Sequence, residues 1–283
     1  MIYYIKQDKS LHFITMKIEG NICRILIKTH NNAIKRITKK MKKKQIEQVV
    51  LSREMKKNKE MVSELNNSNI TIWDGKWLMQ YMIKEIIIYL KQKHKINGSD
   101  EIAVLVNNMN NEVITNIKEL ANNYKKVRIV SNNLRMFKKI ESDLFDNKGI
   151  SIIISNNKRK ALINSSLIVN FDFNQEVIEQ YAINEKAIII NMNDNIKINK
   201  KRFCGFVTTD YEVEFENENS GKLDLVDIIE KQKEFSLKEI LEEQIYNNVV
   251  KLDKYNTFDE VRKIIEEYNI HIKELRGING ILE

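Results

Sequence analysis

The stretch from Ile102 to Asn191 contains five short apolar runs: IAVLV at 102–106, VRIVS at 127–131, ISIII at 150–154, LIVNF at 167–171 and AIIIN at 187–191. Helical patterns separate most of them, at 111–124, 134–147, 158–163 and 174–181. Short runs rich in β-branched residues, alternating with helices, are typical of a parallel sheet covered on both faces. We therefore predict an α/β fold with a doubly wound parallel sheet, to which 203–208 adds a further strand. A ligand crevice is expected at the carboxyl ends of the strands.

The first hundred residues predict a second, smaller α/β unit. Strand patterns occur at 2–5, 12–18, 22–28, 49–52 and 70–73, and helical patterns at 32–44, 53–66 and 76–95. Glu19-Gly20-Asn21 fits a hairpin turn, because Gly and Asn tolerate positive φ. Asp74 is placed to cap the last helix, which is long enough to join two lobes.

The C-terminal segment is acidic, and we expect it to be helical. Ser236-Leu237-Lys238-Glu239 and Thr257-Phe258-Asp259-Glu260 both match the capping box, with a hydroxyl at the N-cap and Glu three residues later. Lys95–Asp100 reads as a linker. The predicted domains are therefore 1–97 (α/β, ending in the long helix), 98–212 (the parallel sheet) and 213–283 (a helical tail packing on the others).

Charge is distributed unevenly along the 283 residues, whose formal net charge is +8. Residues 1–98 carry 21 basic and 8 acidic side chains, whereas residues 211–283 carry 10 and 18. A basic front can meet nucleic acid or another anionic surface, or the acidic tail can pack against it within one molecule. Lys, Ile and Asn are abundant and Pro is absent, which indicates an AT-rich genome and weakens arguments from Lys or Asn alone.

Several classes of protein find no support in the sequence. The four His residues show no metal-ligand spacing, and we predict no metal site. Cys23 and Cys204 lie in strand-like runs, and we expect a buried free thiol at each. No signal peptide or membrane span is evident, so we expect a cytoplasmic protein that makes no use of a membrane.

The middle unit is similar to the NAD(P)-binding domain of shikimate-dehydrogenase-like and glutamyl-tRNA-reductase-like enzymes. Val127–Asn133 resembles their second strand and its polar motif, which reads the cofactor ribose. Ala161–Asn170 resembles their fourth-strand region, and Ala187–Asn191 their fifth strand. The resemblance covers about 76–210 in pattern. It implies a Rossmann-like fold, with NAD or NADP as the cofactor and the helix at 76–95 joining two lobes.

The turn after the first strand departs from that family. It reads Asn107-Asn108-Met109-Asn110-Asn111, without the glycines that bring backbone amides close to a pyrophosphate. Glu112 adds a carboxylate in the first helical turn, where a phosphate would otherwise be favoured. Ser131-Asn132-Asn133 replaces the acidic residue that binds the ribose, and Arg135 could meet a 2′-phosphate.

A site in this crevice would use mainly carboxamides. The residues at the predicted strand ends and turns that could contact a cofactor or other small ligand are Asn107, Asn108, Asn111, Asn132, Asn133, Arg135, Asn170 and Asp172. Asn170 and Asp172 are the polar groups best placed to face the crevice; turn chemistry at a strand end is their structural explanation. No catalytic residue can be identified.

Three functional hypotheses follow. The first is a ligand-binding or regulatory protein with a degenerate phosphate loop and no classical dehydrogenase activity. The second is an NAD(P)-dependent oxidoreductase of the shikimate-dehydrogenase type. The third is a nucleic-acid-binding protein that uses the basic helix at 32–44, through Lys39, Lys40, Lys42 and Lys43; a solvated Lys-rich face is the simpler interpretation. The sequence determines neither the ligand nor the oligomeric state.

Overall fold

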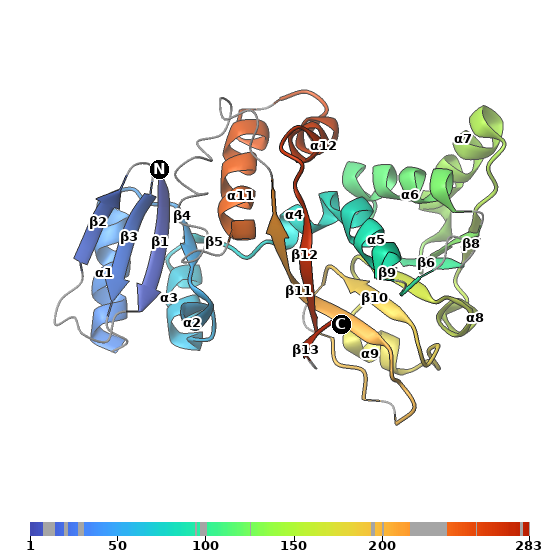
Figure 1. The fold of residues 1–283 in the computed structure, drawn as a ribbon, viewed down its shortest axis with the longest axis horizontal. Coiled ribbons are helices and arrows are strands. Elements are labelled where there is room, and N and C mark those ends of the chain that lie inside the picture. Colours follow the sequence, from blue (N-terminus) through green and yellow to red (C-terminus); the bar gives the residue numbers. More distant parts are fainter. Residues whose placement is uncertain are drawn as a thin grey trace. The chain divides into compact units, whose positions relative to one another are not determined.

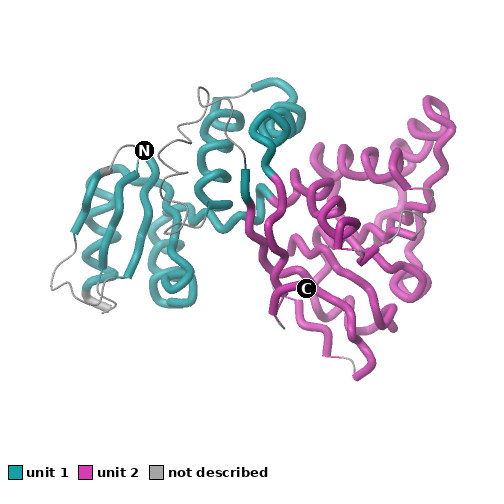
Figure 2. Tube along the Cα trace, viewed as in Figure 1, with its two compact units in different colours: residues 1–78, 214–270 teal, residues 79–213, 271–283 magenta. Residues whose placement is uncertain are grey.

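The computed structural model describes residues 1–7, 15–19, 22–27, 31–93, 95–96, 101–124, 126–193, 196–199, 201–215, 237–252, 254–277 and 280–282. They form two compact units, which Figure 2 distinguishes by colour: unit 1 is 1–78 with 214–270, and unit 2 is 79–213 with 271–283. The two units are defined by contacts between residues, whereas the predicted domains are segments that would fold independently. The predicted domain limits at 97 and 212 therefore stay a prediction.

Unit 1 contains a five-stranded sheet in the order β2-β3-β1-β4-β5 (Figure 1). The strands are β1 (Ile2–Gln7), β2 (Thr15–Glu19), β3 (Ile22–Ile27), β4 (Gln48–Leu51) and β5 (Thr71–Trp73). All neighbouring pairs are parallel except β2 and β3, whose antiparallel pairing confirms the predicted hairpin. The middle residues of its turn, 20 and 21, lie outside the described residues.

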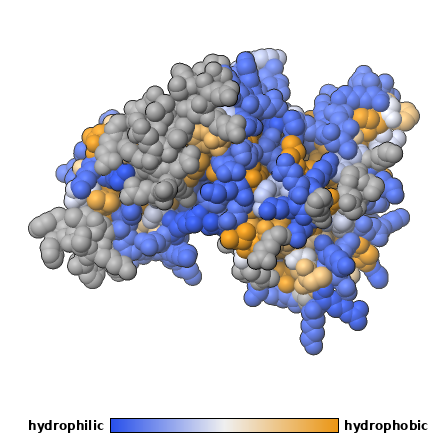
Figure 3. Space-filling view, viewed as in Figure 1, coloured by the Kyte–Doolittle hydropathy of each residue, from blue (hydrophilic) through white to orange (hydrophobic). Residues whose placement is uncertain are grey.

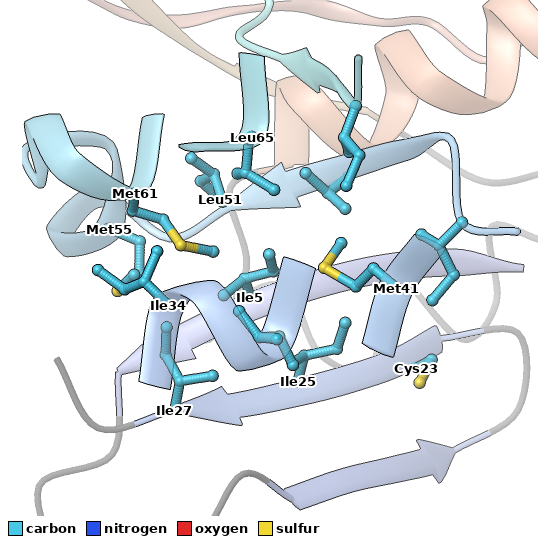
Figure 4. Close-up of a cluster of buried hydrophobic side chains, with 14 residues drawn as sticks. Ile5, Cys23, Ile25, Ile27, Ile34, Met41, Leu51, Met55, Met61 and Leu65 are labelled. Atoms are coloured by element: carbon cyan, nitrogen blue, oxygen red, sulfur yellow. The ribbon is translucent and has the colours of Figure 1, made fainter. Parts of the chain in front are cut away.

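Three helices cover one face of this sheet: α1 (Asn31–Lys43), α2 (Arg53–Lys56) and α3 (Lys59–Asn67). Figure 4 shows Ile34 and Met41 of α1 packed with Ile5, Ile25 and Leu51 of the strands in one buried cluster. The single helix predicted at 53–66 is divided, because Asn58 caps a new helix by accepting a hydrogen bond from the Met61 amide (3.0 Å).

The opposite face of the sheet carries the predicted acidic helices α11 (Leu237–Ile245) and η2 (Tyr246–Val250), followed in the chain by α12 (Thr257–Glu267). Helix α11 contacts β1, β4 and β5, and the Tyr246 ring lies 4.8 Å from that of Trp73. The capping box at Thr257 was wrong: Asn256 is the N-cap, in a left-handed conformation, and the Thr257 hydroxyl points back to the Lys254 carbonyl. Ser236, the other expected cap, is outside the described residues.

The prediction of one continuous helix at 76–95 was also wrong. The structure has α4 (Lys76–Tyr81) and α5 (Ile83–Gln92), separated at Met82, where the backbone leaves the helical region (ψ 13°). Asp74 accepts from the Lys76 amide (2.9 Å), as expected of a capping residue. A second carboxylate, Glu242 of α11, accepts from the amides of Gly75 (2.5 Å) and Leu78 (2.9 Å). Carboxylates at a helix start are stabilised by the unpaired amides there.

Gly75 is required at this junction. Its φ is +84°, and a Cβ would lie 2.9 Å from the Lys238 side chain. The two tryptophans on either side of it, Trp73 and Trp77, both contact the Tyr246 ring. Their emission therefore reports on the packing of α11 and η2 in unit 1.

Unit 2 contains an eight-stranded sheet in the order β13-β12-β11-β10-β9-β6-β7-β8. The strands are β6 (Ile102–Leu105), β7 (Val127–Val130), β8 (Ile153–Ser155), β9 (Leu167–Asn170), β10 (Ile188–Asn191), β11 (Phe206–Glu214), β12 (His271–Gly277) and β13 (Gly280–Ile281). Strands β6 to β11 pair with one another in parallel, which confirms the predicted α/β class. Numbered along the chain, these six strands have the order 3-2-1-4-5-6, which defines a Rossmann-like sheet.

Helices lie on both sides of this sheet in Figure 1: α6 (Asn111–Asn123), η1 (Leu134–Phe137), α7 (Lys138–Lys148), α8 (Lys158–Asn164) and α9 (Gln175–Glu179). Ala103, Leu105 and Ile168 pack in one cluster with α8 and α9. The alternate strand residues, such as Val104 and Ile129, are buried as well. Both faces are therefore covered, as a doubly wound sheet requires.

The end of the chain adds strands that the sequence did not predict. After α12, β12 joins the edge of the unit 2 sheet beside β11 and pairs antiparallel with β13. Its HIKELRG sequence mixes charged and apolar residues, so it carried no clear strand signal.

Two further expectations concern the cysteines and the surface. Cys23 is buried, but Cys204 is exposed, because β11 begins only at Phe206 and Cys204 lies in the loop before it. On the face shown in Figure 3, hydrophilic residues cover most of the described surface, with apolar residues in separate patches. None of the helices in the described part of the chain is both long and apolar enough to cross a membrane.

The carboxylates of α11 make the stability of unit 1 depend on pH. Burial raises the pKa of Glu242 from 4.5 to about 7, and the nearby Asp74 carboxylate contributes a smaller rise. The hydrogen bonds that Glu242 accepts from backbone amides act in the opposite direction. Burial also raises the pKa of Glu243 to about 7. The folded state therefore holds protons that the unfolded state has released, and the stability from these groups is complete below about pH 4.5 and lost as pH rises through about 7.

We predict that the free energy of unfolding falls between pH 5 and pH 8, by an amount on the order of a few kcal/mol. Glu242→Gln keeps an acceptor for the α4 amides and should show a shallower fall. Urea unfolding at several pH values, followed by tryptophan emission, measures this. Glu60→Gln, an exposed change on α3, should keep the wild-type slope. A Glu242→Gln curve parallel to wild type would contradict the prediction.

Candidate functional site

The candidate site lies where the order of the unit 2 sheet reverses. Strand β6 pairs with β7 on one side and with β9 on the other, so the connections from the two halves of the sheet leave in opposite directions. In sheets of this type, the carboxyl ends of the strands at such a point border the ligand crevice. Asn107 follows β6 here, Asn132 follows β7, and Asp172 follows β9.

The carboxylate of Asp172 fills the turn after β6. It accepts hydrogen bonds from the Asn107 amide (2.8 Å to Oδ1 and 2.9 Å to Oδ2) and from the Asn108 amide (2.7 Å). The Asn108 side chain donates a further hydrogen bond to Oδ2 (3.0 Å). Two consecutive backbone amides and a carboxamide thus converge on one internal anion. This turn is the position at which a Rossmann-fold protein holds the pyrophosphate of a dinucleotide.

A chain of side-chain contacts extends from this turn to α8. The Asn107 side-chain oxygen accepts a hydrogen bond from the backbone amide of Asn132 (2.9 Å). The Asn132 side-chain oxygen in turn accepts one from the Lys158 ammonium (2.6 Å). The Lys158 nitrogen also lies 5.7 Å from the centre of the Phe173 ring. These contacts join the turns after β6, β7, β8 and β9 into one polar network at the same edge of the sheet.

Asn170 holds the loop that presents Asp172. Its side chain is fully buried; it donates to the Phe173 carbonyl and to the Asn191 side chain (2.8 Å each) and accepts from the Phe173 amide (3.0 Å). Because these contacts use the side-chain groups of Asn170, its observed role is to position the loop at the end of β9.

The remaining predicted residues lie on or next to the turns at this edge of the sheet. Asn111 begins α6, for which Asn110 provides the cap by accepting from the Val113 amide (2.8 Å). The Asn133 amide donates to the Ser131 hydroxyl (3.0 Å), and Arg135 is exposed on η1. Within the described part of the chain, no contact joins the side chains of Asn111, Asn133 or Arg135 to Asp172. The structure therefore brings together Asn107, Asn108, Asn132 and Asp172, with Asn170 as their support.

Two members of this network, Lys158 and Phe173, were not predicted from the sequence. Lys158 begins α8, which Asn157 caps by accepting from the Lys160 amide (3.0 Å). The signal was present: 155–158 is the turn after a predicted strand and so had to reach the same edge of the sheet. Among the described residues no group of three His, Cys, Asp or Glu side chains could hold a metal ion.

The chain matches no protein-family model, and no curated protein matches it. Solved structures give distant likenesses. Shikimate 5-dehydrogenase from Listeria monocytogenes, in complex with shikimate and NAD, has a TM-score of 0.30 at 10% identity, covering 93% of this chain and 95% of that one. L-tryptophan dehydrogenase from Nostoc punctiforme has a TM-score of 0.31 at 9% identity, covering 87% and 75%.

Ornithine carbamoyltransferase from Pyrococcus furiosus has a TM-score of 0.28 at 9% identity, covering 74% of this chain and 75% of that one. Dehydrogenases and transferases thus score alike, and likenesses of this size carry no argument about activity. The Rossmann-like assignment depends on the strand order observed in the chain itself.

We predict that Asn170→Ala destabilises the protein by at least about 2 kcal/mol, because two buried groups, the Phe173 amide and the Asn191 side chain, each lose a partner at about 1–3 kcal/mol per group. Thermal or urea unfolding measures the change. Asn174→Ala, which removes only the exposed cap of α9, is the matched control and should cost about 1 kcal/mol. Equal losses in the two variants would show that Asn170 does not support the site.

Proposed function

We propose that the chain is a ligand-binding or regulatory protein built on a Rossmann-like scaffold, without classical dehydrogenase activity. One observation carries this proposal: the Asp172 carboxylate accepts hydrogen bonds from both backbone amides of the turn where a dinucleotide pyrophosphate would lie.

A pyrophosphate would have to displace this carboxylate. Asp172 belongs to the same chain and is presented by a loop that Asn170 fixes, so its effective concentration at the amides is high, in the millimolar range or above. A second anion beside it would be repelled. Glu112 adds another carboxylate in the first turn of α6, where it accepts from the Tyr81 hydroxyl (3.2 Å). Both features disfavour a bound dinucleotide.

The alternative is an NAD(P)-dependent oxidoreductase of the shikimate-dehydrogenase type. It would require Asp172 to leave the turn whenever cofactor binds, so part of the binding energy would be spent on breaking its hydrogen bonds. Arg135, exposed on η1, would then be the candidate for contact with a 2′-phosphate. The binding experiment below separates this alternative from the proposal.

The side chains around the turn that Asp172 occupies indicate which kind of ligand could bind there. Asn108 and Asn132 are exposed carboxamides that can both donate and accept, and the Lys158 ammonium lies beside Asn132. Carboxamides and one ammonium fit a small molecule that bears hydroxyl or carboxylate groups. We therefore propose a small polar ligand that enters beside Asp172 and leaves it in place.

We predict that NAD(H) and NADP(H) at millimolar concentration do not change the thermal midpoint of the wild-type protein. Asp172→Ala, by contrast, leaves the Asn107 and Asn108 amides free to bind an anion. Inorganic phosphate at about ten times its Kd should then raise the midpoint of this variant by about 2–4 °C while leaving wild type unchanged.

Asp172→Asn removes the charge but keeps an acceptor oxygen at the two amides, so it should gain less from phosphate than Asp172→Ala, whose own cooperative thermal transition establishes that it is folded. Asp146→Ala, an exposed change on α7, is the control for lost negative charge. A wild-type midpoint several degrees higher with one nicotinamide cofactor would overturn the proposal in favour of the oxidoreductase. A folded Asp172→Ala protein that gains nothing from phosphate would show that the turn does not bind anions.

A further inference from the structure

Helix α1 carries a dense set of cations on its exposed side. Six residues of the helix are basic and exposed, and a seventh follows in the turn after it: Lys35, Arg36, Lys39, Lys40, Lys42, Lys43 and Lys44. We call these seven residues the α1 basic face. The segment 35–44 contains no acidic residue.

The acidic helix of unit 1 does not neutralise this face. Val49 and Leu51 of β4 pack with α1, whereas Gln48, which faces the other way, donates to Glu243 of α11 (3.0 Å). Helices α1 and α11 therefore cover opposite faces of the sheet. Glu239 of α11 pairs with Lys56 and with Lys238. Across the described residues, no ion pair joins the α1 basic face to an acidic side chain.

One described acidic residue, Glu64 of α3, contacts α1 on its buried side. It accepts from the Thr38 hydroxyl (3.2 Å), and the Thr38 side chain is 2% exposed. Thr38 is three residues from Lys35 and four from Lys42, so Glu64 lies at one border of the basic face, whose lysines and arginine remain exposed.

The apolar side of α1 is fully used inside unit 1. Ile34, Ile37 and Met41 are at most 1% exposed and belong to the core in Figure 4. No apolar stripe remains for insertion among lipid chains, which is what holds an amphipathic helix at a membrane. An anionic polymer is therefore the better partner for this face than a lipid surface.

The spacing of the cations suits duplex nucleic acid. From Lys35 to Lys43 the helix rises about 12 Å, and over that length a duplex carries about seven phosphates. Six basic residues of α1 lie within this span, so the two linear charge densities match. The face contains no aromatic residue, and stacking on aromatic rings is how proteins bind unpaired bases.

We propose that the α1 basic face binds the phosphate backbone of duplex nucleic acid without sequence preference. This interaction is independent of the crevice in unit 2. It depends on charge alone, so affinity falls steeply as salt rises, and it does not distinguish one base sequence from another.

The test uses the full chain and two duplex DNAs of unrelated sequence, with binding followed by fluorescence anisotropy over a range of salt concentrations. Wild type should bind both duplexes with Kd values within about threefold of each other, and log affinity should fall linearly with log salt. The variant Lys39→Gln, Lys40→Gln, Lys42→Gln, Lys43→Gln should bind at least about tenfold more weakly at low salt. Its slope should be shallower by roughly 0.9 for each phosphate contact removed.

A matched control separates this face from net charge. Lys138→Gln, Lys139→Gln, Lys160→Gln and Lys201→Gln together remove the same charge from exposed positions of unit 2 and should leave binding within about twofold of wild type. Circular dichroism and the thermal midpoint establish that both variants are folded. Equal losses in the two variants, no binding by wild type at low salt, or binding to anionic vesicles without binding to duplex would each overturn the proposal.

Discussion

The hydrogen bonds from the Asn107 and Asn108 amides to Asp172 are the constraint on which the interpretation of unit 2 depends. A Rossmann-like sheet leaves backbone amides at the turn after its first strand, and those amides need an acceptor. A cofactor normally supplies it as phosphate. Here a carboxylate from the end of β9, 65 residues further along the chain, supplies it from within. The scaffold is thus complete without an external anion, and fold alone implies no dehydrogenase chemistry.

The same physics recurs in unit 1. Glu242 accepts from the Gly75 and Leu78 amides at the start of α4, 167 and 164 residues away in the sequence. In both places an internal carboxylate satisfies amides that a turn or helix start leaves unpaired, and it ties two distant segments of one unit together. The two sites differ in burial. Glu242 is 1% exposed, so removing its charge from water is costly and its pKa rises to about 7, whereas Asp172 lies at a partly exposed edge.

The sequence predicted the sheet of unit 2 well, because strands such as Ile102–Val106 and Ala187–Asn191 are buried on both faces. Such strands are continuous apolar runs, which the local sequence alone reveals. It could not predict what filled the Asn107–Asn111 turn. The missing glycines indicated that the pyrophosphate-binding turn is altered. The acceptor that occupies it comes from a distant strand end, and no local sequence pattern reveals such a contact. Helix limits failed for a similar reason: Asn58 and Met82 interrupt helices through backbone geometry and local caps that apolar periodicity does not register.

The charge asymmetry along the sequence left two possibilities open: the basic front meets an anionic partner, or the acidic tail packs against it within one molecule. The structure shows a more selective use of that charge. Glu239 pairs with Lys56, but Glu242 faces amides and Glu243 faces the side chains of Gln48 and Asn247. All three carboxylates lie on α11, on the face of the sheet opposite α1, and both Glu242 and Glu243 accept hydrogen bonds from neutral groups. Because these carboxylates lie on the far face of the sheet and, among the described residues, no ion pair joins an acidic side chain to the α1 basic face, the cations of that face stay exposed to solvent.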